Sequence, residues 1–119
     1  SHIPKEKEEA EKIAVEDDRL TPEEHRERYF QYVISTIESN KYYPITEQKK
    51  EHQSSVGVRL FIGRTGQVRK VELLREATYE ALTEAAIESI RRSAPFRPFP
   101  AMIPDEELVL NAVIQFRLY

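Results

Sequence analysis

Apolar residues change their spacing along the chain, and these changes divide it into predicted helices and strands. Before Asn40 the apolar side chains recur at helical spacing: Phe30, Val33, Ile34 and Ile37. Thr21 stands ahead of this run as a capping residue, with Pro22 at the first helical position and Glu24 at the third. The pattern predicts an amphipathic helix over residues 22–39, with a left-handed cap at Asn40 and an apolar stripe that needs cover.

The next segment changes from helical to strand spacing. Pro44 begins a predicted short helix that runs to about Glu51 and is polar almost all round, and residues 52–55 predict a loop. A period of two then indicates a half-buried strand with one inward face: Val56, Val58, Leu60 and Ile62. A turn at residues 63–66 and a second strand at residues 68–74 complete a predicted hairpin.

Thr78 is the predicted cap of a third helix, residues 79–93, that Pro95 ends. Its inward face would carry Leu82, Ala85, Ala86 and Ile90. Phe96 and Phe99 then predict an extended segment that docks on the core, in preference to a polyproline ligand.

Residues 105–107 predict a charged turn, and residues 108–118 alternate as the longest strand. The order of elements predicts an α+β fold. It has a three-stranded antiparallel sheet in the order 2-1-3, helices packed on one face and an extra N-terminal helix.

Composition and charge add limits to this fold. Of the 119 residues, 39% are hydrophobic and 33% charged, which fits one domain plus a solvated extension. We expect residues 1–20 to be a charged linker end that begins with a cloning remnant, Ser1-His2, and residues 21–119 to be the domain. The halves at residues 1–41 and 42–119 carry net charges of −4 and +1, so nucleic acid is not an expected partner. No apolar run matches a membrane span or signal peptide, which suggests a fragment of a longer, membrane-anchored chain.

The chain shows no pattern typical of catalysis. It contains no cysteine, which excludes thiol nucleophiles, thiolate zinc sites and iron–sulfur clusters. His2, His25 and His52 are scattered and are predicted to lie on the surface, without metal-ligand spacing. The two glycines Gly63 and Gly66 precede a strand and not a helix, so they predict a hairpin turn and no phosphate loop. We therefore predict no catalytic residue, no cofactor and no metal.

The distribution of charge predicts which sheet edge binds a partner. The first strand carries only Arg59, which suits the centre of the sheet, whereas Arg69, Lys70 and Glu72 blunt the second strand as an edge. The last strand has no proline and one charge, so its outer edge is suited to β-augmentation by an extended peptide. The candidate partner-binding residues are Leu108, Val109, Leu110, Asn111, Ala112, Val113, Ile114, Gln115, Phe116 and Arg117. Cover by the chain's own N-terminal segment, or by a second copy in a homodimer, is the alternative.

Several short motifs in order resemble a known family. They are Tyr43-Pro44, Val56-x-Val58-x-Leu60-x-Ile62, Thr65-Gly66-x-Val68, Leu82-x-x-Ala85-Ala86 and Pro95-Phe96-Arg97-Pro98. Together, over residues 42–119, they resemble the C-terminal domain of TonB, the periplasmic energy transducer. Asn40-Lys41-Tyr42-Tyr43-Pro44 stands where the family often has Gln-Pro-x-Tyr-Pro. Asn40, Tyr42 and Tyr43 therefore join the candidate partner contacts, although Tyr42 and Tyr43 suit core packing equally.

The resemblance implies a periplasmic domain of a protein anchored in the bacterial inner membrane. Such a domain would work with an inner-membrane proton-channel complex through an upstream segment. It would couple proton motive force to outer-membrane TonB-dependent transporters, whose N-terminal box peptide adds to the last strand. Because the upstream segment is rich in Lys, Glu and Ala, a TolA-like cell-envelope domain is an alternative. A structural or scaffold domain of another envelope machine is a further one.

Overall fold

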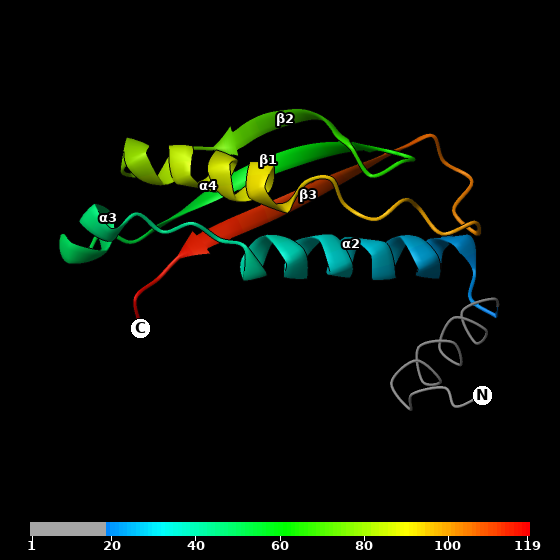
Figure 1. Cartoon of the computed structure of the whole chain (residues 1–119), viewed down its shortest axis with the longest axis horizontal. Coiled ribbons are helices and arrows are strands. Elements are labelled where there is room, and N and C mark those ends of the chain that lie inside the picture. Colours follow the sequence, from blue (N-terminus) through cyan, green and yellow to red (C-terminus); the bar gives the residue numbers. More distant parts are fainter. Residues whose placement is uncertain (1–18) are drawn as a thin grey trace, which may run out of the picture.

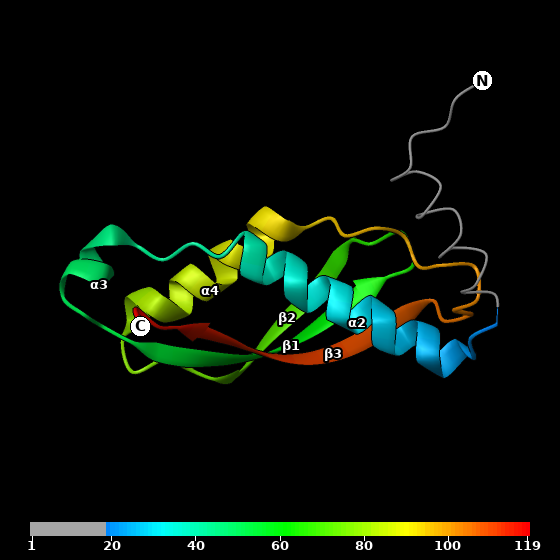
Figure 2. The same ribbon diagram turned by 90° about the horizontal axis from the view of Figure 1, so that it is seen from below.

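The computed structural model describes residues 19–119 and contains a three-stranded antiparallel sheet with helices on one face (Figures 1 and 2). Its elements are α2 (Pro22–Ser39), α3 (Ile45–Lys49), β1 (Ser54–Gly63), β2 (Val68–Arg75), α4 (Glu80–Ser93) and β3 (Glu107–Phe116). The strand order is β2-β1-β3. The predicted α+β fold and strand order are therefore confirmed, whereas the predicted linker lies almost wholly outside the described residues.

Both long helices cover the same face of the sheet, and the core lies between them and β1 (Figure 2). The predicted inward residues of β1 are all fully buried: Val56, Val58, Leu60 and Ile62. On β3 the alternate residues that face them are also buried, at Leu108, Leu110, Ile114 and Phe116. A period of two on both strands thus places one apolar row from each strand under the helices.

Both of these strands differ from their predicted bounds. Ser54 and Ser55, predicted as loop, belong to β1 and pair with Phe116 and Gln115. Glu107, predicted as part of a charged turn, already pairs with Gly63, and β3 ends at Phe116 and not at residue 118. Polar residues at strand ends are held by the ladder of the neighbouring strand, which sequence spacing does not report.

Helix α2 begins as predicted but buries a partly different stripe. Thr21 Oγ1 accepts from Glu24 N–H and Glu24 Oε1 accepts from Thr21 N–H, both at 3.1 Å. The buried residues follow a spacing of four: His25, Tyr29, Val33 and Ile37. Of the predicted stripe, Val33 and Ile37 are buried, whereas Phe30 and Ile34 are half-buried and pack against the core. Asn40 is not left-handed, with φ at −106°, and its side chain instead donates to Thr36 O at 2.8 Å.

Helix α4 is capped one residue later than predicted. The N-cap is Tyr79, and the Thr78 N–H donates to Ser54 Oγ at 2.9 Å instead of Thr78 capping the helix. The predicted inward face is buried, and Ser89 and Ser93 are buried beside it. Each of these hydroxyls donates to a carbonyl four residues earlier at 2.8 Å, which satisfies a polar group in the core.

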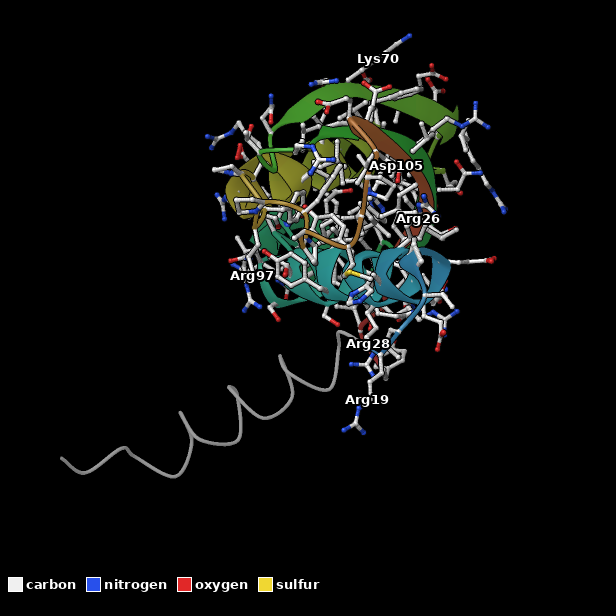
Figure 3. All side chains as sticks on the ribbon, turned by 90° about the vertical axis from the view of Figure 1, so that its right-hand side faces the viewer. Arg19, Arg26, Arg28, Lys70, Arg97 and Asp105 are labelled. Carbon is white, nitrogen blue, oxygen red and sulfur yellow. The ribbon has the colours of Figure 1, made fainter. Side chains whose placement is uncertain are left out.

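The segment after α4 is fixed to the β1–β2 turn. Gly66 adopts φ +91° and its carbonyl accepts from Phe96 N–H at 2.8 Å. A Cβ at Gly66 would lie 2.0 Å from Phe96 O, so only glycine allows this approach. Phe96 and Phe99 are buried, which confirms that this segment docks on the core. Farther along, Arg26 of α2 pairs with Asp105 at 2.7 Å (Figure 3).

We expect α2 to be part of the folding unit, because its inner stripe completes the core. Ile37→Ala should lower the free energy of unfolding by about 2–5 kcal/mol, since Ile37 is 3% exposed. Ile45→Ala makes the same chemical change at a side chain 62% exposed, so its effect should stay within about 0.5 kcal/mol. Urea denaturation of both variants checks this, and equal effects would contradict the packing of α2 on the sheet.

We also expect the cap of α2 to depend on pH. Hydrogen bonds from the Thr21 backbone and hydroxyl hold the pKa of the Glu24 carboxyl below its ordinary value of 4.5. Because the folded pKa is depressed, this stabilisation is present above the ordinary value and is lost as pH falls through the lowered one. Glu24→Gln should lower the urea midpoint more than Glu23→Gln at about pH 7, and the excess should shrink as the pH falls below the ordinary pKa of the carboxyl. A constant excess across this range would contradict the cap.

Candidate functional site

The outer edge of β3 carries main-chain groups with no strand to pair them. Arg64 N–H donates to Glu106 O at 3.1 Å, whereas Gly63 N–H donates to Gln67 O at 2.9 Å on the β2 side. Since main-chain direction alternates along a strand, even-numbered residues of β1 bond to β3 and odd-numbered ones to β2. In β3 the odd-numbered residues therefore point their N–H and C=O outward: Glu107, Val109, Asn111, Val113 and Gln115. Across residues 19–119 no strand pairs with this edge.

The side chains of the same odd-numbered residues lie on the face without helices. Val109 is 47% exposed and Val113 is 61% exposed, with Asn111 between them. Asn111 Oδ1 accepts from Arg59 Nε at 3.0 Å, which fixes the amide beside the edge. On this face, a strand that pairs with β3 would thus lie beside two exposed valines and one amide that is held by a hydrogen bond.

On the helix side, α2 forms a second wall of the edge. A shallow apolar crevice lies between α2 and β3, lined by Ile34, Ile37, Glu38, Ala112 and Ile114 among others. An added strand alternates its side chains between the two faces. Its residues would therefore meet this crevice and the exposed valines in turn.

One outward group of β3 is already occupied by the chain itself. Lys41 Nζ donates to Gln115 O at 2.5 Å and also pairs with Glu38 Oε2 at 2.8 Å. Lys41 also lies over the Phe116 ring, 5.8 Å from its centroid. The residues after α2 therefore hold the C-terminal end of β3, and sequence spacing had given no signal of this contact.

The candidate residues outside β3 are placed in three ways. Asn40 is exposed at the end of α2. Tyr42 is 37% exposed, with the Arg92 guanidinium 4.4 Å from its ring centroid and its N–H on Ser89 Oγ at 2.8 Å. Tyr43 is half-buried and meets the Phe116 ring edge-on at 5.2 Å. Arg117 lies just past β3 and is exposed.

Within β3 the candidates divide into two rows. Leu108, Leu110, Ala112, Ile114 and Phe116 direct their main chain to β1 and their side chains toward the helices. Only the odd-numbered row is free to pair, so the structure brings together half of the predicted strand residues at the edge. The alternation along the strand predicts these two rows, but it does not say which row faces β1 until the pairing of the strands is known.

Two histidines lie in different settings from those predicted. His25 is 4% exposed and its Nε2 has no hydrogen-bond partner among residues 19–119. His52 Nδ1 lies 2.9 Å from Oε1 of the buried Glu47, and its ring stacks on Tyr79 at 3.7 Å. The prediction that His25 lies on the surface is therefore wrong, whereas His52 is half-buried with 26% of its side chain exposed. The short helix is polar as predicted, but it buries one of its polar residues, Glu47. The part of the chain that the structure describes contains no group of His, Cys, Asp or Glu that could hold a metal ion.

The fold and the unpaired edge of β3 define a small α+β protein-interaction module. Residues 39–118 match the family described as the Gram-negative bacterial TonB protein C-terminal, and the chain belongs to this family. Domains of this family are non-enzymatic protein-interaction domains that generally bind outer-membrane receptors and are typically periplasmic. In residues 19–119 no helix has the length and apolar character needed to cross a membrane.

Solved structures agree with this assignment. The C-terminal domain of TonB from Helicobacter pylori (residues 179–285) is 26% identical with a TM-score of 0.60, covering 73% of this chain and 78% of that one. A shorter form of it (residues 194–285) is 24% identical with a TM-score of 0.57, covering 72% and 89% respectively. No curated protein matches the chain. The predicted resemblance to the TonB C-terminal family is therefore confirmed.

We expect amide hydrogen exchange to resolve the two rows of β3. The N–H groups of Leu108, Leu110, Ala112 and Ile114 are committed to β1 and should exchange only on unfolding of the sheet. Those of Val109, Asn111 and Val113 point outward and should exchange faster, by at least about tenfold. Amide-resolved exchange by NMR checks this. Equal protection of both rows would mean that something pairs with the edge in solution.

Proposed function

We propose that the chain is the periplasmic domain of an inner-membrane-anchored energy transducer. Residues 21–119 would form its folding unit. The domain would couple proton motive force to outer-membrane TonB-dependent transporters by binding the transporter's N-terminal box peptide as a fourth strand on β3. The observation that carries this proposal is the outward row of main-chain groups from Glu107 to Gln115 beside two exposed valines.

Main-chain pairing suits a domain that meets several receptors. Backbone hydrogen bonds supply affinity without reading the peptide's side chains, and the valines and the α2 crevice add a preference for apolar residues. A strand that adds to β3 shares its hydrogen bonds along the strand direction. A pull along that direction loads all of these bonds together, which suits a protein that transmits force.

Lys41 would compete with the added peptide for a main-chain acceptor at one end of this edge. Its ammonium occupies the Gln115 carbonyl, which is an acceptor that an added strand would need. The peptide would then either displace Lys41 there or pair from Val113 toward Glu107 only. An inner-membrane proton-channel complex would be contacted through a segment upstream of the domain, and this part of the proposal rests on the family alone.

The opposite edge carries features that oppose pairing. Arg69 bonds Glu107 at 3.3 Å and Lys70 bonds Glu72 at 3.1 Å, and Lys70 points away from the helices (Figure 3). Charged side chains along an edge strand hinder the approach of another strand. The two edges thus favour a single peptide site on β3.

A matched pair of prolines tests the site. Val113→Pro removes an outward N–H of β3, and Leu73→Pro removes one of β2, since Leu73 faces the even-numbered Val58. In an NMR titration with N-terminal peptides of the transporters of the same organism, Val113→Pro should lower affinity at least about tenfold. Leu73→Pro should leave the affinity unchanged. Both variants should keep the dispersed spectrum of the folded domain, because neither proline removes a bond to β1.

Three results would argue against the proposal. Shifts in residues 68–75 would place the peptide on β2, and silence with every peptide would favour a TolA-like or scaffold role. Concentration-dependent line broadening along β3 without peptide would indicate a homodimer through the same edge, which sedimentation would confirm.

A further inference from the structure

A polar basin lies where β3 ends, next to the proposed peptide edge. It has a volume of about 630 Å³ and is lined by Ser55, Arg75, Gln115, Arg117 and Tyr119 among others. Ser55 and Gln115 are direct partners in the β1–β3 ladder. The basin therefore opens at the end of the sheet where β1 begins and where β2 and β3 finish, near the C-terminus in Figure 1.

Two arginines line the basin, and the nearest carboxylate that the hydrogen bonds identify is that of Glu51, which accepts from the hydroxyl of the lining residue Tyr119 at 3.2 Å. Neither the Arg75 nor the Arg117 guanidinium makes a hydrogen bond or ion pair with another residue of 19–119. The arginines elsewhere on the sheet and its turn do have carboxylate partners: Arg59 with Glu72, Arg64 with Glu106 and Arg69 with Glu107. No acidic side chain lines the basin, and Glu76, next to Arg75 in sequence, is not part of the lining.

The pairing register of the three strands places the basin next to the β3 edge. Arg75, Gly57 and Val113 lie in one row across the three strands. Because Gly57 has no side chain, nothing stands on this row between Arg75 and the exposed Val113. Arg117 lies one residue past the end of β3 and lines the basin, so it stands next to the end of the edge to which a peptide would be added. A residue one or two places beyond the paired segment would be level with Arg117.

We propose that the basin is an acidic subsite of the peptide edge: it receives one or two carboxylates that flank the strand-forming part of the partner peptide. This inference rests on the proposed function and adds the chemistry of the partner. Arg117 would contact the carboxylate directly and Arg75, farther across the sheet, would act mainly through its field, within the Debye length of about 8–10 Å.

Four related peptides test the subsite. A transporter peptide that binds the edge is extended by Asp-Asp or by Asn-Asn, at either its N-terminal or its C-terminal end. At one of the two ends Asp-Asp should bind about two- to fivefold more tightly than Asn-Asn at low salt, and the difference should vanish near 0.5 M salt. The responding end also gives the strand direction, because an N-terminal response requires an antiparallel peptide and a C-terminal one a parallel peptide.

Three single-charge variants separate the subsite from general attraction. Arg117→Gln should abolish the preference for Asp over Asn, and Arg75→Gln should reduce it by a smaller factor. Lys70→Gln removes the same charge from the opposite edge strand of the sheet and should leave the preference unchanged. Asn-Asn peptides should bind all three variants as they bind the wild-type chain.

The outcomes distinguish this inference from the proposed function. If Asp-Asp and Asn-Asn peptides bind the β3 edge equally at both ends, or if Lys70→Gln acts as strongly as Arg117→Gln, the subsite is wrong while the edge remains. If the Asp preference persists in full in Val113→Pro, the basin binds acid independently of the edge and the link between them is wrong. If no peptide binds the domain at all, the proposed function is wrong, and the subsite that rests on it is wrong as well.

Discussion

Strand β1 forms main-chain hydrogen bonds to a neighbouring strand on each of its two sides, and the rest of the structure depends on this constraint. A central strand must give alternate main-chain groups to its two neighbours. Its even-numbered residues bond to β3, and this commits the even-numbered residues of β3 inward. The same choice buries the apolar side chains of Val56 and Leu60 under the helices. The outward-facing main-chain groups of β3 are therefore a consequence of core packing, and no additional structural feature is needed to expose them.

The helices finish this arrangement on one face only. Helix α2 buries Val33 and Ile37 against the sheet while leaving the outer main chain of β3 uncovered by any other strand of the described chain. On the other face Arg59 bridges β3 and β2 through Asn111 and Glu72. Arg59 and Glu72 thus neutralise each other on that face, and its exposed valines are left as apolar surface beside the edge. The inward-facing groups of β3 stabilise the fold and its outward-facing groups form the proposed binding surface, so one strand can serve both roles.

Sequence patterning was sufficient for the strand order, because alternation and charge are local properties of each strand. It failed where a residue's setting depends on distant chain. Tyr29 is buried since its hydroxyl donates to Arg97 O at 2.6 Å, and burial raises its pKa to about 12, so it stays a donor. Glu47 is buried and its carboxylate contacts the half-buried His52, and Lys41 reaches Gln115, 74 residues away. Hydrogen-bonded polar residues of this kind resemble surface residues in any hydropathy pattern.

A strand edge alone binds many peptides with similar strength, because every residue supplies the same backbone groups. Selectivity must then come from side chains next to the edge and not from the ladder itself. The Lys41 contact occupies one acceptor at the C-terminal end of β3, and the basin at Arg117 lies at that same end. Charges placed there act on the approach and the register of a peptide more than on its total affinity, since exposed ion pairs are weak individually. Tight and general binding along β3 is thus compatible with discrimination at one end, because the two properties rest on different atoms.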